Sequence, residues 1–454
     1  MGRNCTRHCG GRRLTTAVEH YVAARKGLAL PGAGSGWLDD LRDAGARRFS
    51  ETGFPTLRDE NWRYTNIRPI LKQNFTPALA VGEPAEGEGL ADFPVPGLDA
   101  HRLVFVNGRF DRERSDMVSL PDGIVAIPMS EAVASGLEGV RAWLGKCMTG
   151  DGGGFTDLNT AYIENGLYLQ VERDCRMERP IELVFVGVSP AGQLVQPRNL
   201  FVAGEHSRVH IIERYVSGDG HSHLTNAVTE LVAAESSEVE HTRLQEEGAA
   251  AFHIGGVFMR LAGGARVVSN NAALGSLIAR TNLHVALCAK GASCDLNGVY
   301  LGSGRQHIDN FTQVDHCAPD CRSNEYYKGV LNDRSRAVFH GRIIVREDAQ
   351  HTDAQQQNRN LLLSGNAEVD TKPQLEIYAD DVKCSHGATI GQLDDTAMFY
   401  LRTRGIDENS ARGLLTYAFA ADVINRISSA PVRDHLEGVL GRKMFGVERM
   451  DELV

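Results

Sequence analysis

Between residues 204 and 369 a short polar corner returns along the chain at nearly regular intervals. Each copy places small and charged residues ahead of a β-rich run, and no long helical pattern interrupts the series. The copies are Gly204–Val209, Glu235–Val239, Gly263–Val267, Gly291–Asp295, Asp333–Ala337 and Gly365–Val369. The copies follow one another at a nearly constant period of about 28 residues. One step is longer by half a period: it runs from position 294, the fourth residue of the fourth copy, to position 336, the fourth residue of the fifth. A unit of about 14 residues, two to each period, accounts for both spacings.

Such a unit is typical of a solenoid, in which every strand pairs with the coils above and below it. Small residues suit the corners of a coil because neighbouring backbones crowd there, and glycine is abundant, at 48 of 454 residues. A β-sandwich also has short strands and frequent turns, so it remains the alternative. The regular spacing favours the solenoid.

Helical patterns flank this β-rich region. Apolar residues stand at helical spacing in 14–22, in 37–44 and again from Leu414 to Ile427, where Asp407 can cap the helix. We therefore predict a mainly β fold, a β-solenoid core between helical termini. Composition and pattern divide the chain into an N-terminal helical region 1–81, a linker 82–97, a mixed α/β connection 98–164, the core 165–395 and a C-terminal helical region 396–454.

Charge and hydropathy exclude two classes of partner. The formal net charge is −10, so the chain lacks the basic footprint expected of a nucleic-acid-binding protein. No run of about 18 apolar residues occurs, which argues against a membrane-spanning helix. Nine cysteines without a secretory signal indicate reduced thiols. We expect a bacterial cytoplasmic protein rather than a plastid one, although residues 1–38 weakly resemble a transit peptide.

Three clusters combine histidine with a second metal-binding side chain. His221 and His223 offer only two imidazoles, and we interpret them as part of a surface turn. The segment His316–Cys321 offers one imidazole and two thiols, but no second pair stands at zinc-finger spacing. Cys384 and His386 are two residues apart, so on a strand they share a face. A thiolate beside an imidazole can bind iron or zinc.

Other polar residues suggest a structural role or a catalytic alternative. The amide-rich segment Thr352–Asn360 can form hydrogen-bonded ladders between coils. Some β-solenoid enzymes cleave acidic sugars with carboxylates, although this chain lacks an obvious aromatic platform for a sugar. The candidate carboxylates are Asp309, Asp315, Asp353, Asp380 and Asp381. No phosphate-binding loop occurs, so any nucleotide must be bound by a partner.

One long motif carries a specific resemblance. The segment Lys372–Thr389 and the following Gly391–Asp395 and Phe399–Ile406 closely resemble the SufB/SufD family of iron–sulfur cluster assembly proteins, and within it the SufD branch. Gly53–Pro55, Asp59–Thr65 and Tyr327–Gly329 match the family as well. The similarity extends over residues 50–430 and does not include the segment 1–13.

The resemblance implies a right-handed parallel β-helix flanked by helices, and a scaffold subunit that is not itself an enzyme. It implies a heterodimer with SufB, in which each subunit binds one copy of the ATPase SufC through C-terminal helices. The cargo would be iron or a nascent iron–sulfur cluster, held transiently, with sulfur delivered by a cysteine desulfurase. ATP would be bound by SufC and not by this chain.

The resemblance also assigns individual residues. His386 matches the histidine that the family places at the SufB–SufD interface, so we expect it to bind iron or a cluster shared with SufB, with Cys384 beside it. Leu401 stands where SufB-like sequences have a cysteine, which argues against a SufB-like subunit acting alone. For SufC docking we expect Arg404, Asp407 and Glu408. A β-helix polysaccharide enzyme is the remaining alternative.

Overall fold

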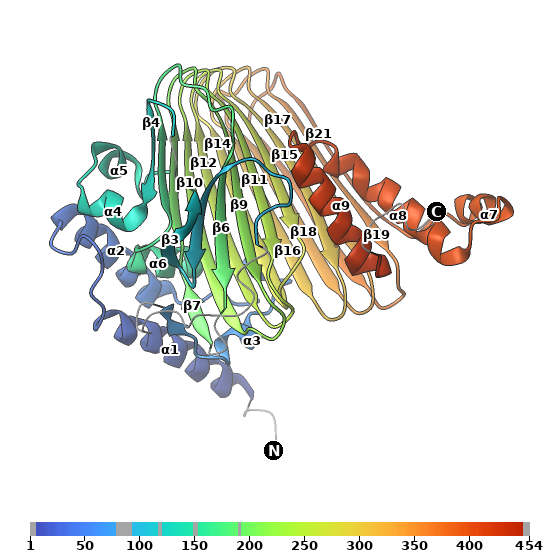
Figure 1. The fold of residues 1–454 in the computed structure, drawn as a ribbon, viewed down its shortest axis with the longest axis horizontal. Helices are drawn as coiled ribbons and strands as arrows, with labels where there is room; N and C mark the ends of the chain where they lie inside the picture. Colours follow the sequence, from blue (N-terminus) through green and yellow to red (C-terminus); the bar gives the residue numbers. More distant parts are fainter. Residues whose placement is uncertain (1–5, 79–92, 117–119, 149–152, 189–191, 448–454) are drawn as a thin grey trace.

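The structure is a computed structural model that describes residues 6–78, 93–116, 120–148, 153–188 and 192–447. Two large sheets run side by side, and from β8 onward the chain passes from one to the other at successive corners (Figure 1). Two strands therefore make one coil, and the solenoid has about 7 turns. Neighbouring strands of the coils are parallel. The predicted β-solenoid is confirmed, and the β-sandwich alternative is wrong.

The strands of the first sheet follow one another in the order of the coils. They are β4 (Ile124–Pro128), β5 (Leu167–Val171), β8 (Arg198–Ala203), β10 (His223–Ala233), β12 (Phe252–Leu261), β14 (Ile278–Leu287), β16 (His307–His316), β18 (Arg336–Val345) and β20 (Glu368–Ile377), with β7 (Gln193–Val195) and β1 (Thr76–Pro77) beside β10.

The second sheet supplies the other strand of each coil. Its members are β3 (Arg109–Asp116), β2 (His101–Val106), β6 (Ile181–Gly187), β9 (Arg208–Ser217), β11 (Glu238–Glu246), β13 (Arg266–Ala273), β15 (Ser293–Gly302), β17 (Arg322–Leu331), β19 (Asp353–Leu362) and β21 (Lys383–Gly391). Strand β2 belongs to the second sheet and β4 to the first. The two sheets therefore already include part of the segment 98–164.

The register of the coils explains the period of the sequence. Val239 pairs with Val267, and Val267 pairs with Cys294, so one coil corresponds to one period of the polar corners. All three side chains are buried in the same apolar cluster, because residues that pair in register point to the same side of the sheet. Each coil therefore adds one layer to a continuous core along the solenoid axis.

The corners are tight turns, as their composition predicts. Ser236, Gly264 and Gly291 have φ values of 57°, 64° and 75°, and Asp333 has 54°. This left-handed conformation is least costly for glycine and is tolerated by small polar residues such as aspartate. His206, with φ 57°, shows that one bulkier residue is also accommodated at a corner.

Helices cover the outer faces of both sheets. The helical elements are α1 (Thr6–Arg25), α2 (Gly36–Thr52), the 3₁₀ helix η1 (Glu60–Trp62), α3 (Arg68–Leu71), α4 (Met129–Ala134), α5 (Glu138–Trp143), α6 (Gly153–Tyr162), α7 (Asp395–Thr403), α8 (Glu408–Ile424) and α9 (Ala430–Phe445). The predicted helices at 14–22, at 37–44 and after Asp407 are confirmed.

The two groups of helices pack on different sheets. Helices α1, α2 and α6 contribute to an apolar cluster with Phe252 and Ile254 of the first sheet. Helices α8 and α9 lie on the second sheet, where Ile424 and Leu436 pack with Val299 (Figure 1). Helix α7 instead projects away from the coils (Figure 1).

Residues 79–92, which include most of the predicted linker 82–97, lie outside the described residues, as do residues 1–5. The last part of the linker packs against the solenoid: Val95 is buried, and its N–H donates to Glu182 Oε1 at 3.1 Å.

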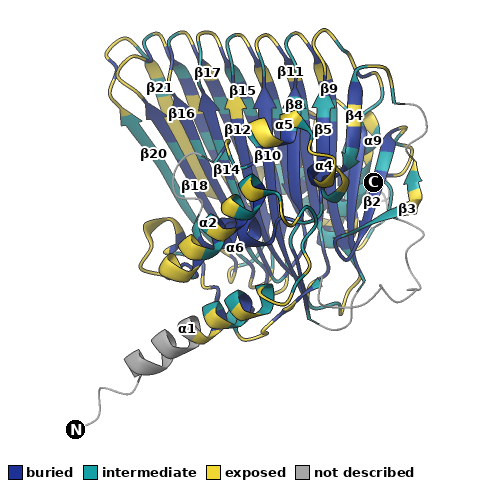
Figure 2. Ribbon diagram, turned by 90° about the vertical axis from the view of Figure 1, so that its left-hand side faces the viewer, coloured by how far each residue is buried: buried dark blue, intermediate teal, exposed yellow. Residues whose placement is uncertain are grey.

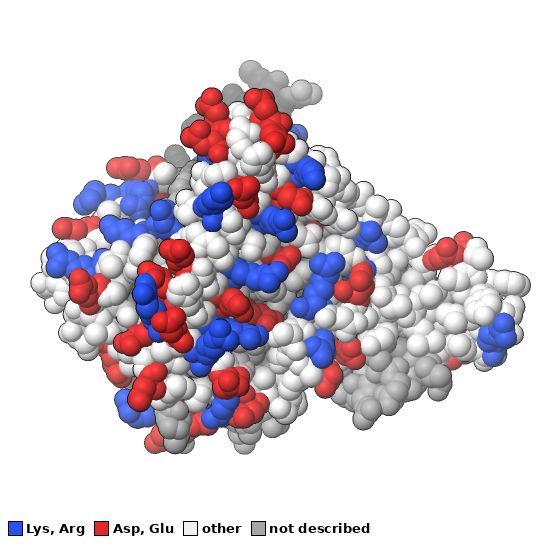
Figure 3. All heavy atoms as spheres, turned by 90° about the horizontal axis from the view of Figure 1, so that it is seen from above, with Lys and Arg blue, Asp and Glu red and all other residues white. Residues whose placement is uncertain are grey.

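The surface agrees with the absence of a basic footprint. On the face that Figure 3 shows, basic and acidic side chains are interspersed, and charge becomes sparse toward the end that carries α7. Of the helices that the structure describes, none is both long and apolar enough to cross a membrane.

Candidate functional site

The solenoid ends in β20 and β21, and in the described residues no strand pairs with the outer edge of either one. Strand β21 is exposed along most of its length and β20 is largely half-buried, whereas earlier strands are mostly buried (Figure 2). We call β20, β21, the corner 378–382 between them and α7 the open end. It holds five of the seven large apolar side chains exposed in the described residues: Ile377, Tyr378, Ile390, Phe399 and Tyr400.

The free edges of the two strands differ. In a parallel ladder, alternate residues bond to the strand on either side. The N–H of Lys383 donates to the carbonyl oxygen of Thr352, the residue before β19, so Cys384, His386 and Ala388 direct their N–H groups to the free edge. By the same rule Pro373, which has no N–H, lies at a free-edge position of β20. The free edge of β21 is therefore the more complete hydrogen-bonding edge.

Cys384 and His386 both lie on β21, in register with Ala354 and Gln356 of β19. Cys384 packs at the edge of an apolar cluster that includes Ile343 and Ala354, so its side chain faces the lumen of the solenoid. Burial, followed by the charge of Asp353, raises the pKa of its thiol. His386 is exposed, and the two-residue spacing directs it to the same side. The structure therefore places both residues on one strand, β21, as the predicted common face requires.

A buried polar column runs inward from His386. Glu325 of β17 pairs in register with Gln356 of β19, which pairs with His386. Gln356 Nε2 donates to Glu325 Oε2 at 2.7 Å, and Thr312 donates to the same oxygen at 3.0 Å. Glu325 and Gln356 have exposed fractions of 0% and 1%. Burial raises the pKa of Glu325 to about 7.

We did not identify Glu325 and Gln356 from the sequence as site residues. The spacing of the coils was the signal that could have found them. One period back from His386 along the sequence is Gln356, and a second period back is Glu325, one residue in each preceding coil.

The structure places part of each of the other two clusters in the core. The interpretation of His221 and His223 as a surface turn is wrong for His223, which is buried at the start of β10. Its Nε2 lies 3.1 Å from Glu247 Oε1, and this partner makes its burial tolerable. Glu247 Oε2 also lies 2.6 Å from His253 Nδ1.

In the segment His316–Cys321, the ends are buried and Cys317 is exposed. His316 Nε2 is 2.8 Å from Ser323 Oγ. Nowhere in the described parts of the chain do three or more His, Cys, Asp or Glu side chains form a group that could hold a metal ion. Any metal bound by Cys384 and His386 therefore needs further ligands from outside the described residues.

The amide-rich segment Thr352–Asn360 forms the predicted links between coils. Asn358 Nδ2 donates to the hydroxyl of Tyr300 at 2.9 Å, and Asn360 Nδ2 donates to Thr389 O at 3.3 Å. Since these side chains connect β15, β19 and β21, their structural role is confirmed.

The candidate carboxylates of a sugar-cleaving site have separate surroundings. Asp309 is buried and bonded to Arg280, and Asp315 accepts from Arg346 Nη2 at 2.7 Å. Asp353 is the first residue of β19, while Asp380 and Asp381 lie in the corner before β21.

The residues expected to dock a partner lie where α7 meets α8. Asp407 caps α8, accepting from the N–H groups of Asn409 and Ser410 at 2.9 and 3.1 Å. The guanidinium of Arg404 lies 5.0 Å from the ring centre of Tyr400. Arg404, Asp407 and Glu408 are all exposed, so charge at this corner is available to another protein.

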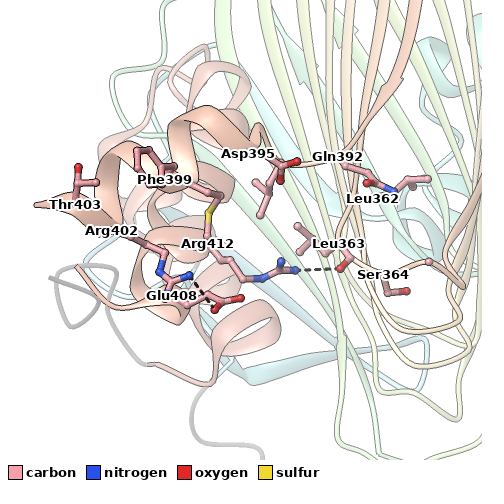
Figure 4. Close-up of a pocket in the computed structure, with 13 residues that line it drawn as sticks. Leu362, Leu363, Ser364, Gln392, Asp395, Phe399, Arg402, Thr403, Glu408 and Arg412 are labelled. Carbon is pink, nitrogen blue, oxygen red and sulfur yellow. Dashed lines mark hydrogen bonds and ion pairs between the residues drawn. The ribbon is translucent and has the colours of Figure 1, made fainter. Parts of the chain in front are cut away.

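A cavity of about 710 Å³ lies between the helices α7 and α8 and the corner that joins β19 to β20 (Figure 4). Glu408 lines it and lies 3.6 Å from Arg402, while Arg412 Nη2 donates to Leu363 O at 3.0 Å. Phe399 lines the opposite side and is 70% exposed. Leu401, which follows Phe399 and Tyr400, is half-buried.

Comparisons with known proteins cover nearly the whole chain. Residues 19–183 match the SufBD protein N-terminal region, and residues 185–419 match the SufBD core domain of SUF system FeS cluster assembly. An iron–sulfur cluster assembly SufBD family protein of Synechocystis sp. is 31% identical over 93% of this chain and 94% of its own length.

Two further relatives come from a bacterium and a plant. The iron–sulfur cluster assembly protein SufD of Escherichia coli is 31% identical over 89% of this chain and 92% of its own length. Protein ABCI7, chloroplastic, of Arabidopsis thaliana is 27% identical over 94% of this chain and 90% of its own length.

Proposed function

This chain belongs to the SufBD family of the SUF iron–sulfur cluster assembly system, and from that membership we propose that it is a SufD-like scaffold subunit. In this role it catalyses no reaction itself, works in the bacterial cytoplasm and helps to build and transfer nascent clusters. The observation that carries the proposal is the uncovered last coil, which presents His386 and Cys384 together at an edge without a partner strand.

The open end is the surface that we assign to SufB. An unpaired strand edge is a template for a strand from another chain, and β21 has the more complete of the two free edges. Exposed Ile390 and Tyr378 add apolar area beside it. Covering these side chains and the backbone edge would remove a surface that is costly to leave in water.

The donor set suits cargo that must be released. A stable iron–sulfur site of the ferredoxin type uses four thiolates, whereas this chain offers one imidazole and one thiol. A neutral imidazole binds iron reversibly. Because the pKa of Cys384 is raised, its thiol keeps its proton at neutral pH and is a weaker ligand than a thiolate. SufB would complete the site, and a cysteine desulfurase would supply the sulfur.

The corner between α7 and α8 is the surface that we assign to SufC. Arg404, Asp407 and Glu408 offer charges of both signs beside the cavity that Figure 4 shows. SufC would bind the ATP. A movement of SufC on hydrolysis would be transmitted to β21 by α7, which joins this corner to β21.

The test of the proposed function is His386→Ala, expressed together with SufB and SufC. We expect a complex of normal yield and melting temperature that assembles little cluster, measured by iron and sulfide content and by visible absorption. Cys384→Ala should be milder. Ser385→Ala is the matched control, because its side chain lies on the same strand but on the opposite face. Normal cluster assembly by His386→Ala, or loss of the complex, would show that this histidine has a structural role only.

A further inference from the structure

The amide of Gln356 has one end satisfied and one end free. Its Nε2 donates to Glu325 Oε2, whereas its Oε1 is buried and has no hydrogen-bond partner among the described residues. A buried acceptor without a donor is unusual and calls for an explanation.

The amides beside it differ in this respect. Asn358 lies two residues along the same strand and faces the same lumen. Its Nδ2 donates to the hydroxyl of Tyr300, and its Oδ1 accepts from Asn360 Nδ2 at 2.7 Å. Both ends of the Asn358 amide are therefore hydrogen-bonded within the solenoid, whereas the amide oxygen of Gln356 has no donor among the described residues.

Glu325 determines which end of Gln356 stays free. Above its pKa of about 7 Glu325 is a carboxylate, which only accepts hydrogen bonds, so it then selects the NH₂ end of the neighbouring amide. The planar amide then directs its oxygen away from that bond. The next side chain of the column, one coil further toward the open end, is His386. Its ring is exposed and makes no hydrogen bond to the described residues, so it is free to turn toward Gln356.

Building on the function proposed above, we propose that Gln356 is a positioning residue for His386. Its amide oxygen accepts the N–H of one ring nitrogen, which leaves the other nitrogen unprotonated and directed toward the iron of the cargo. Histidines that bind metals usually donate their second ring N–H to such an acceptor, which fixes both the tautomer and the direction of the ring. Glu325 acts one step further back, by holding the amide in the required orientation.

The direct test reads the tautomer of His386 by ¹⁵N NMR of the isolated full-length chain at about pH 8. His386→Ala identifies the signals. In the wild type we expect one dominant tautomer, and in Gln356→Leu a mixture like that of a free histidine. Asn358→Leu is the matched control, since it removes a buried amide from the same strand and face, and it should keep the wild-type tautomer.

Exchange of the two polar residues provides a second variant. In Glu325→Gln/Gln356→Glu the new amide donates to the new carboxylate, whose second oxygen still faces His386. The dominant tautomer should therefore be retained, even though both side chains have changed. Should Gln356→Leu fail to fold, a folded exchange variant that has lost the tautomer would overturn the proposal.

Cluster assembly provides an independent readout. In the complex with SufB and SufC, Gln356→Leu should lower assembled cluster by about 10-fold, the low end of the loss seen when the acceptor behind a metal-binding histidine is removed. An unchanged tautomer in Gln356→Leu overturns the positioning role. Normal assembly by His386→Ala overturns the proposed function instead, whatever the tautomer, so the two failures are distinguishable.

Discussion

Glu325 is a fully buried carboxyl group whose hydrogen-bond partners, Gln356 and Thr312, are both uncharged. Burial raises its pKa from about 4.5 to about 7. The folded chain therefore holds this proton more tightly than the unfolded chain. Its contribution to stability is full below about pH 4.5 and is lost as the pH rises through about 7. A shift of this size corresponds to about 3 kcal/mol.

We therefore predict that Glu325→Gln flattens the pH dependence of stability. Between about pH 5 and pH 8 the free energy of unfolding of the wild type should fall relative to that of the variant, by up to about 3 kcal/mol. Urea denaturation of both proteins at several pH values measures the difference. All other titrating groups are shared, so parallel curves would mean that the pKa of Glu325 is not raised.

At the scale of single residues, local spacing predicted the common face of Cys384 and His386, because strand alternation acts over two residues. Local spacing could not predict which side chain from another coil lies next to a given histidine. Gln356 pairs in register with His386 from the preceding coil, and Glu247 makes the burial of His223 tolerable from 24 residues away. Contacts of this kind depend on the register between coils, which only the folded structure fixes.

At the scale of elements, the start of α8 combines two roles that a mutation can confuse. Asp407 is exposed and charged, as a docking residue should be, but its side chain also caps the helix. Replacing it with alanine would weaken both. Asparagine keeps the cap, because its side-chain oxygen also accepts from the first backbone N–H groups.

We predict that Arg404→Ala/Asp407→Asn/Glu408→Ala weakens binding of SufC at least 10-fold while leaving the circular dichroism of the chain unchanged. Loss of about 1.4 kcal/mol across the three exposed charges is enough for that effect. Asp40→Asn on α2, at an exposed position of another helix, is the control and should bind normally. Calorimetry with purified SufC measures the affinity. Unchanged affinity of the triple variant would remove this corner from the docking surface.

Elements with a periodic apolar pattern were predictable one by one, whereas α7 was included only in the predicted C-terminal helical region 396–454. The helices that pack on the coils carry apolar residues at three- and four-residue steps, as α8 does with Ala420 and Ile424. None of the nine residues of α7 is buried, so the helix has no packing partner in the coils that a pattern of core residues could reveal. Likewise β2 pairs with β6, although β3, β4 and β5 come between them in the chain, and local pattern does not specify such a pairing.

For the whole molecule, the described solenoid is a stack of similar layers that begins with the antiparallel strands β3 and β4 and ends with parallel strands that have no outer neighbour. Each earlier coil satisfies its backbone on both sides, so the stack ends in a surface that is already shaped to accept one more pair of strands. The helices cover the outer faces of the sheets but leave this end uncovered. The proposed function then accounts for the position of His386 on the last strand, since a site shared with SufB would have to lie where two chains can meet.

The final prediction tests whether SufB adds a strand to β21. The N–H of Ala388 points to the free edge, whereas that of Thr389 points toward β19. Ala388→Pro should therefore remove one donor for the partner and leave the melting temperature of the isolated chain nearly unchanged. Thr389→Pro should break a bond of the solenoid itself and lower that temperature. Co-purification should then show that Ala388→Pro no longer retains SufB. Normal retention would mean that SufB covers the open end without pairing with this strand.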